Sequence, residues 1–150
     1  MSWATDISRR AMEIVMEYEI KKGRKPEDFS HKKVGYDIHS NNTKEERFIE
    51  VKGVSESWNT YTWQSLHHTQ IDCLKKYPNK FWLYIIRFCI DKENRNLFEL
   101  QRTLPEAYMI PGGDLLDTTK FRIEEESYSL KSALGTTLKV RLQEEKYKNG

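Results

Sequence analysis

The chain has 150 residues and a net charge of only +2, from 25 lysines and arginines against 23 aspartates and glutamates. Its length predicts a single domain, residues 1–150, and an aromatic content of 12% argues against disorder in spite of 32% charged residues. The near balance of charge excludes a polycation, so any contact with nucleic acid must come from a local basic patch.

The apolar segments bear on where the protein works. The polar stretch from Met1 to Arg10 lacks the apolar run of a signal peptide, and the longest apolar run, Phe81 to Ile86, is too short to span a membrane. We therefore expect a soluble, cytoplasmic protein with no membrane partner. Cys73 and Cys89 have apolar neighbours and are predicted to be buried free thiols, with a disulfide as the alternative.

A helix is the first predicted element, from Thr5 or Asp6 to Lys22. Its apolar stripe recurs at helical spacing and consists of Ile7, Ala11, Ile14, Val15 and Tyr18. Gly23 follows in the position where a glycine commonly ends a helix.

The connection from Gly23 to Lys33 is basic. Its cationic side chains include Arg24, Lys25, Lys32 and Lys33. Such side chains suit contacts to phosphate, which supply most of the nonspecific affinity for nucleic acid. A loop that carries lysines for solubility is the alternative, and the sequence favours neither.

Two predicted strands, Val34 to His39 and Arg47 to Lys52, are joined by a polar turn. Side chains two apart on a strand share a face. Glu50 and Lys52 are therefore expected to point to the side opposite Val51, which places an acid and an amine next to each other on a rigid element.

Asp37, in the first of these strands, completes a cluster of two carboxylates and one amine. Asp37 and Glu50 are predicted to bind Mg²⁺ or Mn²⁺, because hard divalent cations take oxygen ligands, and the backbone carbonyl of Val51 is a further candidate ligand. Such an ion polarises a phosphoryl oxygen and acidifies a bound water. Lys52 can orient that water or stabilise negative charge on the phosphate. The alternative is a surface ion pair, which Glu and Lys two apart on a strand commonly form.

The residues of this hairpin resemble a known signature. Asp37, a gap and then Glu50-Val51-Lys52 is similar to the D…ExK motif of the PD-(D/E)XK nuclease superfamily. The fuller wording, GYDI at 35–38 and FIEVKG at 48–53, resembles its DUF3883 branch, which is found alone or fused to helicase and restriction-type proteins. The resemblance covers residues 5–90 and implies a metal-dependent phosphodiesterase with a restriction-endonuclease-like fold.

The resemblance also implies supporting residues. In many nucleases of this superfamily an acid from the first helix approaches the metal, and Glu19 resembles the glutamate of the Tyr-Glu pair in the DUF3883 branch; a solvated helix glutamate is the alternative. The second helix often offers a side chain to the active site, and Gln70 holds that place, where the branch more often has Glu. The superfamily layout further implies a short strand at Asp28 to His31.

Aromatic and polar residues alternate loosely after Gly53, with Trp58, Tyr61 and Trp63 in a stretch that contains a predicted strand from Thr60 to Leu66. Exposed aromatic rings next to a cationic site can stack on unpaired bases. Packing in the core or at a sheet edge is the alternative.

The next elements are a helix and a buried strand. Thr69 as N-cap predicts a helix from Gln70 to Tyr77, with Asp72 reinforcing its first turn. The apolar run from Phe81 to Phe88 predicts a central strand that is covered on both faces.

Residues 91–150 are predicted to add strands to the sheet. The pattern indicates a return strand at Leu97 to Gln101, a short helix at Leu104 to Ile110 and a turn at Pro111 to Asp114. Two alternating segments, Phe121 to Leu130 and Leu138 to Leu142, are predicted to pair as a hairpin.

Together these features predict an α/β domain of restriction-endonuclease type, in which a mixed sheet is flanked by helices and extended by C-terminal strands. The predicted function is metal-dependent hydrolysis of nucleic acid by an endonuclease, with DNA as the expected substrate. A homodimer would allow two active sites to cut two strands. The alternatives are a catalytically inactive nucleic-acid-binding module on the same fold and a protein-interaction module that uses the aromatic stretch from Trp58 to Trp63.

Overall fold

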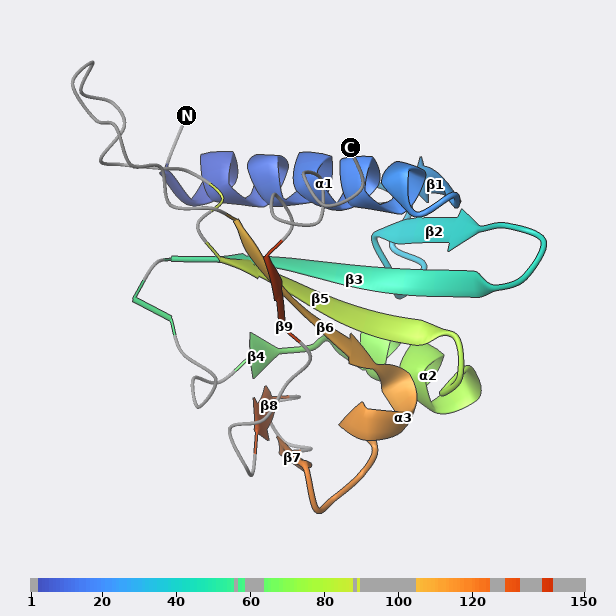
Figure 1. Ribbon diagram of the computed structural model, residues 1–150. Coiled ribbons are helices and arrows are strands. Elements are labelled where there is room, and N and C mark those ends of the chain that lie inside the picture. Colours follow the sequence, from blue (N-terminus) through green and yellow to red (C-terminus); the bar gives the residue numbers. More distant parts are fainter. Residues whose placement is uncertain are drawn as a thin grey trace.

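The computed structural model describes residues 3–55, 57–58, 64–87, 89, 105–124, 129–132 and 139–141. Six strands form a mixed sheet in the order β1-β2-β3-β5-β6-β9, whose neighbours are antiparallel except for the parallel pair β3 and β5 (Figure 1). These strands are β1 (Lys25–Asp28), β2 (Ile38–Asn41), β3 (Glu46–Val54), β5 (Phe81–Arg87), β6 (Glu106–Pro111) and β9 (Lys139–Arg141). The fold is α/β with a restriction-endonuclease-like mixed sheet, as predicted.

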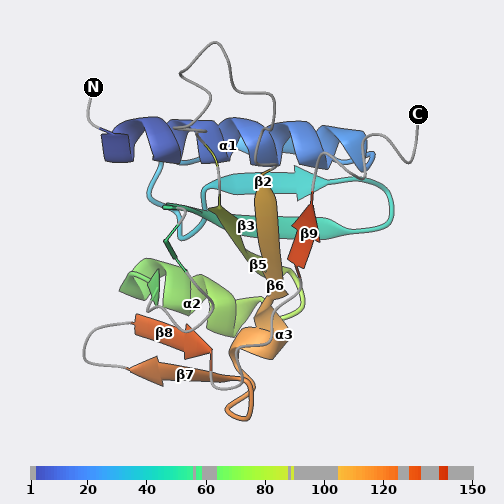
Figure 2. The same ribbon diagram turned by 60° about the vertical axis from the view of Figure 1, so that its left-hand side comes forward.

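Helices cover both faces of this sheet. Helix α1 (Trp3–Lys21) lies along one face, and α2 (His68–Lys76) and α3 (Gly112–Leu115) lie on the other (Figure 1). A smaller sheet of three short strands lies beyond α2, on the side away from α1 (Figure 2). Its strands, in the order β4-β8-β7, are β4 (Gln64–Ser65), β8 (Ser129–Ser132) and β7 (Phe121–Glu124).

Each face of the main sheet has its own hydrophobic core. The core on the α1 side includes Ile7, Ala11, Ile14, Val15, Ile38, Ile49, Tyr84 and Ile86. The core on the α2 side includes Trp58, Leu66, Ile71, Leu74, Phe81, Leu83, Ile85, Tyr108 and Ile110. Strand β5 contributes alternate side chains to both cores, which confirms the prediction of a central strand and places β3 beside the centre of the domain.

Helix α1 begins and ends close to its predicted bounds. Its predicted apolar positions Ile7, Ala11, Ile14 and Val15 are buried against the sheet. Gly23 has a φ of +83° directly after the helix, in the left-handed region that only glycine adopts easily. The chain therefore reverses there and enters β1.

The first two strands differ from their predicted positions. Strand β1 ends at Asp28, because the Asp28 carboxylate accepts hydrogen bonds from the Ser30 backbone N–H and hydroxyl and so closes a turn. Strand β2 begins only at Ile38, because Lys33 and Gly35 have positive φ values of 50° and 95°. The residues from Asp28 to Asp37 are thus mostly loop, and Asp37 lies at the junction of loop and strand.

Helix α2 begins earlier than predicted. His67, not Thr69, is its N-cap residue, and Gln70 rather than Asp72 occupies the third helical position. The Gln70 side chain accepts a hydrogen bond from the His67 backbone N–H, at 2.7 Å between Oε1 and N, which is half of a capping box. The polar type of residue 70 therefore serves the helix start as well as the site described below.

Three predictions for the C-terminal region differ from the structure. The predicted helix from Leu104 to Ile110 is wrong: strand β6 runs there, because pairing with β5 buries its residues Ala107 to Ile110. The predicted turn after it is the short helix α3. The predicted hairpin is also wrong in its pairing, since β7 pairs with β8 while β9 joins β6 in the main sheet.

Some predictions fall on residues that the structure does not describe. The return strand at 97–101 and most of the strand at 60–66 lie outside the described residues.

Cys73 and Cys89 are buried free thiols, as predicted. Within the described part of the chain, no helix has the length and apolar character needed to cross a membrane.

The close approach of Gly35 to α2 predicts a large cost for a side chain there. A Cβ at residue 35 would meet the Thr69 carbonyl oxygen at 2.6 Å, in addition to the strain of a φ of +95°. We expect Gly35→Ala to lower the free energy of unfolding by about 3 kcal/mol. Gly23→Ala is the matched control: its φ is also positive but nothing lies within 4 Å, so we expect a loss of about 1 kcal/mol. Urea unfolding measures both, and equal losses would contradict the packing of this loop on α2.

Candidate functional site

Strand β3 presents Glu50 and Lys52 to the α2 side of the sheet. Ile49 and Val51 belong to the core on the α1 side, while Phe48 and Val54 pack in the core on the α2 side. By strand alternation Glu50 and Lys52 therefore share the α2 face. The predicted alternation of this strand is confirmed.

Asp37 caps the edge of β3 where β2 leaves it. The Asp37 backbone N–H donates to the Ile49 carbonyl at 2.9 Å, and its side-chain Oδ2 accepts from the Val51 N–H at 2.9 Å. The carboxylate thus takes the place of the next backbone partner in the ladder. Strand pairing fixes Asp37 next to Glu50, although the two residues are 13 positions apart in the chain.

Glu50 is the buried member of this pair, with only 3% of its surface exposed. Its Oε2 accepts a hydrogen bond from Gln70 Nε2 at 2.6 Å, and its Oε1 lies 4.0 Å from Lys52 Nζ. Burial raises the pKa of Glu50 most, and a hydrogen bond with Asp37 and the negative charge of Asp37 raise it further. Lys52 and Gln70 oppose this shift, and the resulting pKa is about 9. Without a cation, the raised pKa favours the protonated form of Glu50 at neutral pH.

Gln70 connects the acid pair, Asp37 and Glu50, to the start of α2. Its Oε1 is bound by the His67 N–H and its Nε2 donates to Glu50. An amide held at both ends has little rotational freedom, so it holds the Glu50 carboxyl in one orientation. The structure brings Gln70 into the cluster through this contact.

The carbonyl of Val51 also faces the acid pair. On a strand the N–H and C=O of one residue point to the same side, and the Val51 N–H donates to Asp37. The Val51 carbonyl is therefore directed to the side of β3 that β2 has left open. This direction suits the ligand role that the sequence suggested.

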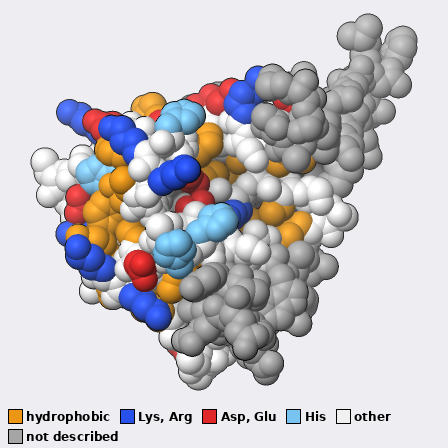
Figure 3. All heavy atoms as spheres, turned by 180° about the vertical axis from the view of Figure 1, so that it is seen from behind, with side chains coloured by type: hydrophobic (Ala, Val, Ile, Leu, Met, Phe, Trp, Pro, Cys, Tyr) orange, Lys and Arg blue, Asp and Glu red, His pale blue; other side chains and the backbone are white. Residues whose placement is uncertain are grey.

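The donor set fits one hard divalent cation that keeps water ligands. Among the described residues no group of three or more His, Cys, Asp or Glu side chains converges as a metal site. Two carboxylates and a carbonyl give three oxygen donors, and Mg²⁺ in proteins is often held by one or two carboxylates with waters. Figure 3 shows one face of the molecule on which acidic side chains lie among basic and histidine side chains.

Glu19 is not part of this cluster, and its predicted role beside the metal is corrected. It is fully buried on the α1 side of the sheet. Both of its oxygens bind the guanidinium of Arg24, and Tyr84 donates a hydrogen bond at 3.0 Å to Oε2. Because Tyr84 and Glu50 lie on opposite faces, the sheet separates Glu19 from the acid pair.

The predicted role of Arg24 in nucleic-acid binding is also corrected. Only 8% of its surface is exposed, and its guanidinium is occupied by Glu19 and, at 2.7 Å, by Glu45. Burial alone would lower the pKa of Arg24, but the hydrogen bonds and charge of Glu19 outweigh burial and raise it. Arg24 is therefore a structural cation.

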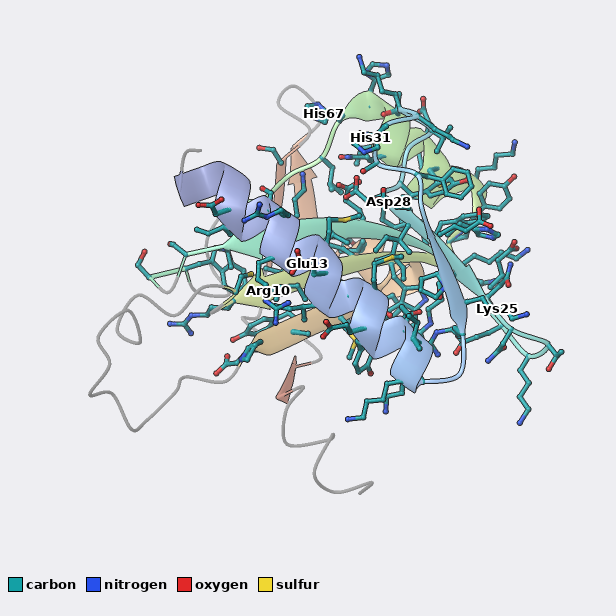
Figure 4. The ribbon with its side chains drawn as sticks, turned by 90° about the horizontal axis from the view of Figure 1, so that it is seen from above. Arg10, Glu13, Lys25, Asp28, His31 and His67 are labelled. Carbon is teal, nitrogen blue, oxygen red and sulfur yellow. The ribbon has the colours of Figure 1, made fainter. Side chains whose placement is uncertain are left out.

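The three predicted lysine contacts lie in two places. Lys25 is exposed at the start of β1, at the end of the molecule away from His31 and His67 (Figure 4). Lys32 and Lys33 are exposed in the loop that packs on α2 and leads into Asp37. The fold therefore does not bring Lys25 together with the other two, and Lys32 and Lys33 remain the candidates beside the site.

Two histidines near this end were not singled out as site residues. His31 and His67 are exposed and lie close to one another in the view of Figure 4. His31 belongs to the loop before Asp37, and the backbone of His67 anchors Gln70. No local pattern marks them, because the packing of this loop against α2 depends on contacts between distant parts of the chain.

Trp58 does not offer a ring for stacking. It is 6% exposed and packs edge-to-face on Tyr108, with ring centroids 5.1 Å apart, in the core on the α2 side. Tyr61 and Trp63 lie outside the described residues. Of the two interpretations of this stretch, packing in the core therefore holds for Trp58, and stacking on bases does not.

Comparison with known protein families assigns the chain. A family model described as "Protein NO VEIN, C-terminal" matches residues 7–100. The chain belongs to this family. The match spans α1, the acid pair, Gln70 and β5, which are the parts of the chain that build the site. No curated protein and no solved structure matches the chain.

Two buried glutamates of this NO VEIN C-terminal domain are expected to respond oppositely to the same substitution. Because the pKa of Glu50 is raised from 4.5 to about 9, the folded protein binds this proton more tightly than the unfolded chain, and stability falls as pH rises between these values. Glu50→Gln should therefore raise the free energy of unfolding at pH 8, on the order of 2 kcal/mol. Glu19→Gln should lower it by about 3 kcal/mol, because the buried guanidinium of Arg24 then keeps only the partly exposed Glu45 as an anion.

Urea unfolding in EDTA from pH 6 to pH 8.5 measures both effects. The wild type should lose stability across this range and Glu50→Gln should not. Destabilisation by Glu50→Gln at pH 8 would contradict a protonated, poorly compensated carboxyl at this position.

Proposed function

We propose that this protein is a metal-dependent nuclease that hydrolyses phosphodiester bonds, with DNA as the substrate. The observation that carries the proposal is the convergence of Asp37, Glu50 and Lys52 on one face of the sheet, with Gln70 holding Glu50. The D…ExK arrangement resembles that of the PD-(D/E)XK superfamily and its DUF3883 branch, and the restriction-endonuclease-like sheet is compatible with it.

Asp37 and Glu50 would hold Mg²⁺ or Mn²⁺, with the Val51 carbonyl as a third oxygen ligand. When bound, such an ion supplies Lewis acidity to a phosphoryl oxygen and lowers the pKa of a bound water. Glu50 must lose its proton to become a ligand, so cation and proton compete for the acid pair. A cation would neutralise the repulsion between the buried Glu50 carboxylate and the partly buried Asp37 carboxylate, and this is the favourable step that it offers here.

Lys52 contributes a cation that the acid pair does not immobilise. Its Nζ is 4.0 Å from Glu50, beyond a direct hydrogen bond, and its side chain is 24% exposed. The amine is therefore available to orient an attacking water or to stabilise charge that develops on a phosphate. Gln70 acts indirectly: its side chain holds the Glu50 carboxyl group in position.

One observation favours a second candidate, a nucleic-acid-binding module without catalysis. A protonated Glu50 that is hydrogen-bonded to Asp37 and Gln70 is a self-consistent arrangement that does not require a metal. Burial of Trp58 weakens the third candidate, a protein-interaction module built on the aromatic stretch. A homodimer and a cytoplasmic location belong to the nuclease proposal as expectations from this class of enzyme.

Cleavage assays distinguish the first two candidates. Plasmid and single-stranded DNA are incubated with Mg²⁺ or Mn²⁺, and we expect cleavage by the wild type. Asp37→Asn and Lys52→Ala should each lower the rate at least about 100-fold, because each removes a group that stabilises the transition state. Lys44→Ala, in the exposed turn between β2 and β3, is the matched control and should cleave like the wild type.

Equal cleavage by all four proteins would indicate a contaminating nuclease and contradict the proposal. Metal-dependent binding of DNA without cleavage by any of them would favour the inactive module.

A further inference from the structure

Five rings from four parts of the chain form a continuous surface on the α2 side of the β1–β2–β3 edge. This aromatic strip consists of Phe29, Tyr36, His39, Phe48 and Tyr77. Neighbouring ring centroids are 5.6 Å apart for Phe29 and Tyr36, 4.8 Å for Tyr36 and Phe48, and 5.0 Å for Phe48 and Tyr77. His39 stacks on Phe48 at 5.2 Å. These contacts bring together rings that are up to 48 positions apart in sequence.

The strip is only partly covered by the protein. All five ring residues are of intermediate exposure, unlike the neighbouring core residues Leu74 and Phe81, which are fully buried. Figure 3 shows hydrophobic side chains gathered at the surface with lysine or arginine side chains at their edge. Aromatic side chains that form a half-exposed cluster of this kind offer π faces to a ligand.

Lysines flank the strip at both ends. Lys32 Nζ lies 4.7 Å from the ring centroid of Phe29, and the amines of Lys76 and Lys80 lie 5.3 Å and 6.0 Å from that of Tyr77. The three lysines are exposed. Glu46, an acid beside the strip, is bound by Lys80 at 2.9 Å and by His39 at 2.7 Å, so its charge is compensated. The surface is therefore apolar in the middle and cationic at its ends.

The strip leads directly into the acid pair. Tyr36 precedes Asp37 in the chain, and Phe48 lies on the same face of β3 as Glu50, two residues away. Two residues along a strand are about 7 Å. A chain of stacked bases on the rings would thus bring its phosphate backbone to the carboxylates and to Lys52.

We propose that the aromatic strip binds an unpaired nucleic-acid strand by stacking its bases on Phe29, Tyr36 and Tyr77 while Lys32, Lys76 and Lys80 contact its phosphates. Half-exposed rings flanked by lysines match the stacking surfaces and cationic grooves that hold single strands without reading their sequence. The inference builds on the proposed nuclease function and specifies its substrate as single-stranded or locally unpaired nucleic acid. It differs from the sequence-based stacking prediction, which placed the platform at residues 58–63.

Binding without cleavage tests the strip separately from the nuclease. Fluorescence anisotropy in EDTA measures the Kd of the full chain for oligo(dT) of about 12 nucleotides, for an abasic strand of equal length and for the matching duplex. We expect the oligo(dT) strand to bind at least about fivefold more tightly than the abasic strand. An oligo(U) strand shows whether DNA or RNA is preferred.

Variants assign the binding to the rings. Phe29→Ala and Tyr77→Leu should each weaken the binding of oligo(dT) about fivefold or more and leave the binding of the abasic strand nearly unchanged. Phe29→Trp, which keeps an aromatic ring, should bind oligo(dT) like the wild type. Lys32→Gln should weaken the binding of both the oligo(dT) and the abasic strand and should reduce the salt dependence of that binding. Tyr18→Ala and Lys22→Gln are the matched controls, because Lys22 Nζ lies 5.4 Å from the Tyr18 ring on α1, away from the strip. They should bind like the wild type.

Equal affinity for oligo(dT) and the abasic strand, or the same effect from Tyr18→Ala as from Phe29→Ala, would overturn the inference. Should thermal melting show that Phe29→Ala does not fold, Tyr77→Leu and Phe29→Trp still decide the outcome. Base-dependent binding without metal-dependent cleavage would support the strip and contradict the nuclease. Metal-dependent cleavage by a protein whose binding is unchanged in the ring variants would support the nuclease and contradict the strip.

Discussion

Two carboxyl groups placed together with little water cannot both carry charge at low cost. Asp37 and Glu50 are placed in this way by the sheet itself, because Asp37 replaces the missing backbone partner of Val51 and Glu50 points into the α2 side. The protein compensates with one amide, from Gln70, and one amine at 4.0 Å, from Lys52. The remaining imbalance is met by a proton on Glu50 or by a divalent cation. The proposed chemistry depends on that exchange.

The opposite face of the sheet shows how the same protein buries a glutamate that needs no further partner. Glu19 has both oxygens bound by Arg24, which also binds Glu45, and receives the Tyr84 hydroxyl. This ion pair ties the end of α1 to the sheet and is complete without a ligand. The contrast with Glu50 separates structure from function: both glutamates are buried, but only Glu50 lacks a full counter-charge.

Much of the site could be predicted from sequence because it is local. Alternation in β3 places Glu50 and Lys52 on one face, and a short hairpin brings Asp37 beside them. The position of Glu19 could not be predicted, because a basic run does not reveal that Arg24 folds back across the Gly23 turn to meet it. Residues 106–111 could not be recognised as a strand, since their place is decided by β5 and β9, which are distant in the chain. The aromatic strip was missed for the same reason.

The most direct test of the account is a crystal structure after a Mn²⁺ soak, with anomalous diffraction to locate the ion. The account predicts one manganese peak in contact with the carboxylates of Asp37 and Glu50, with the Val51 carbonyl as a third protein ligand and Lys52 beside the metal-bound water. An acid pair that keeps its shared proton and shows no anomalous peak at saturating Mn²⁺ would contradict it.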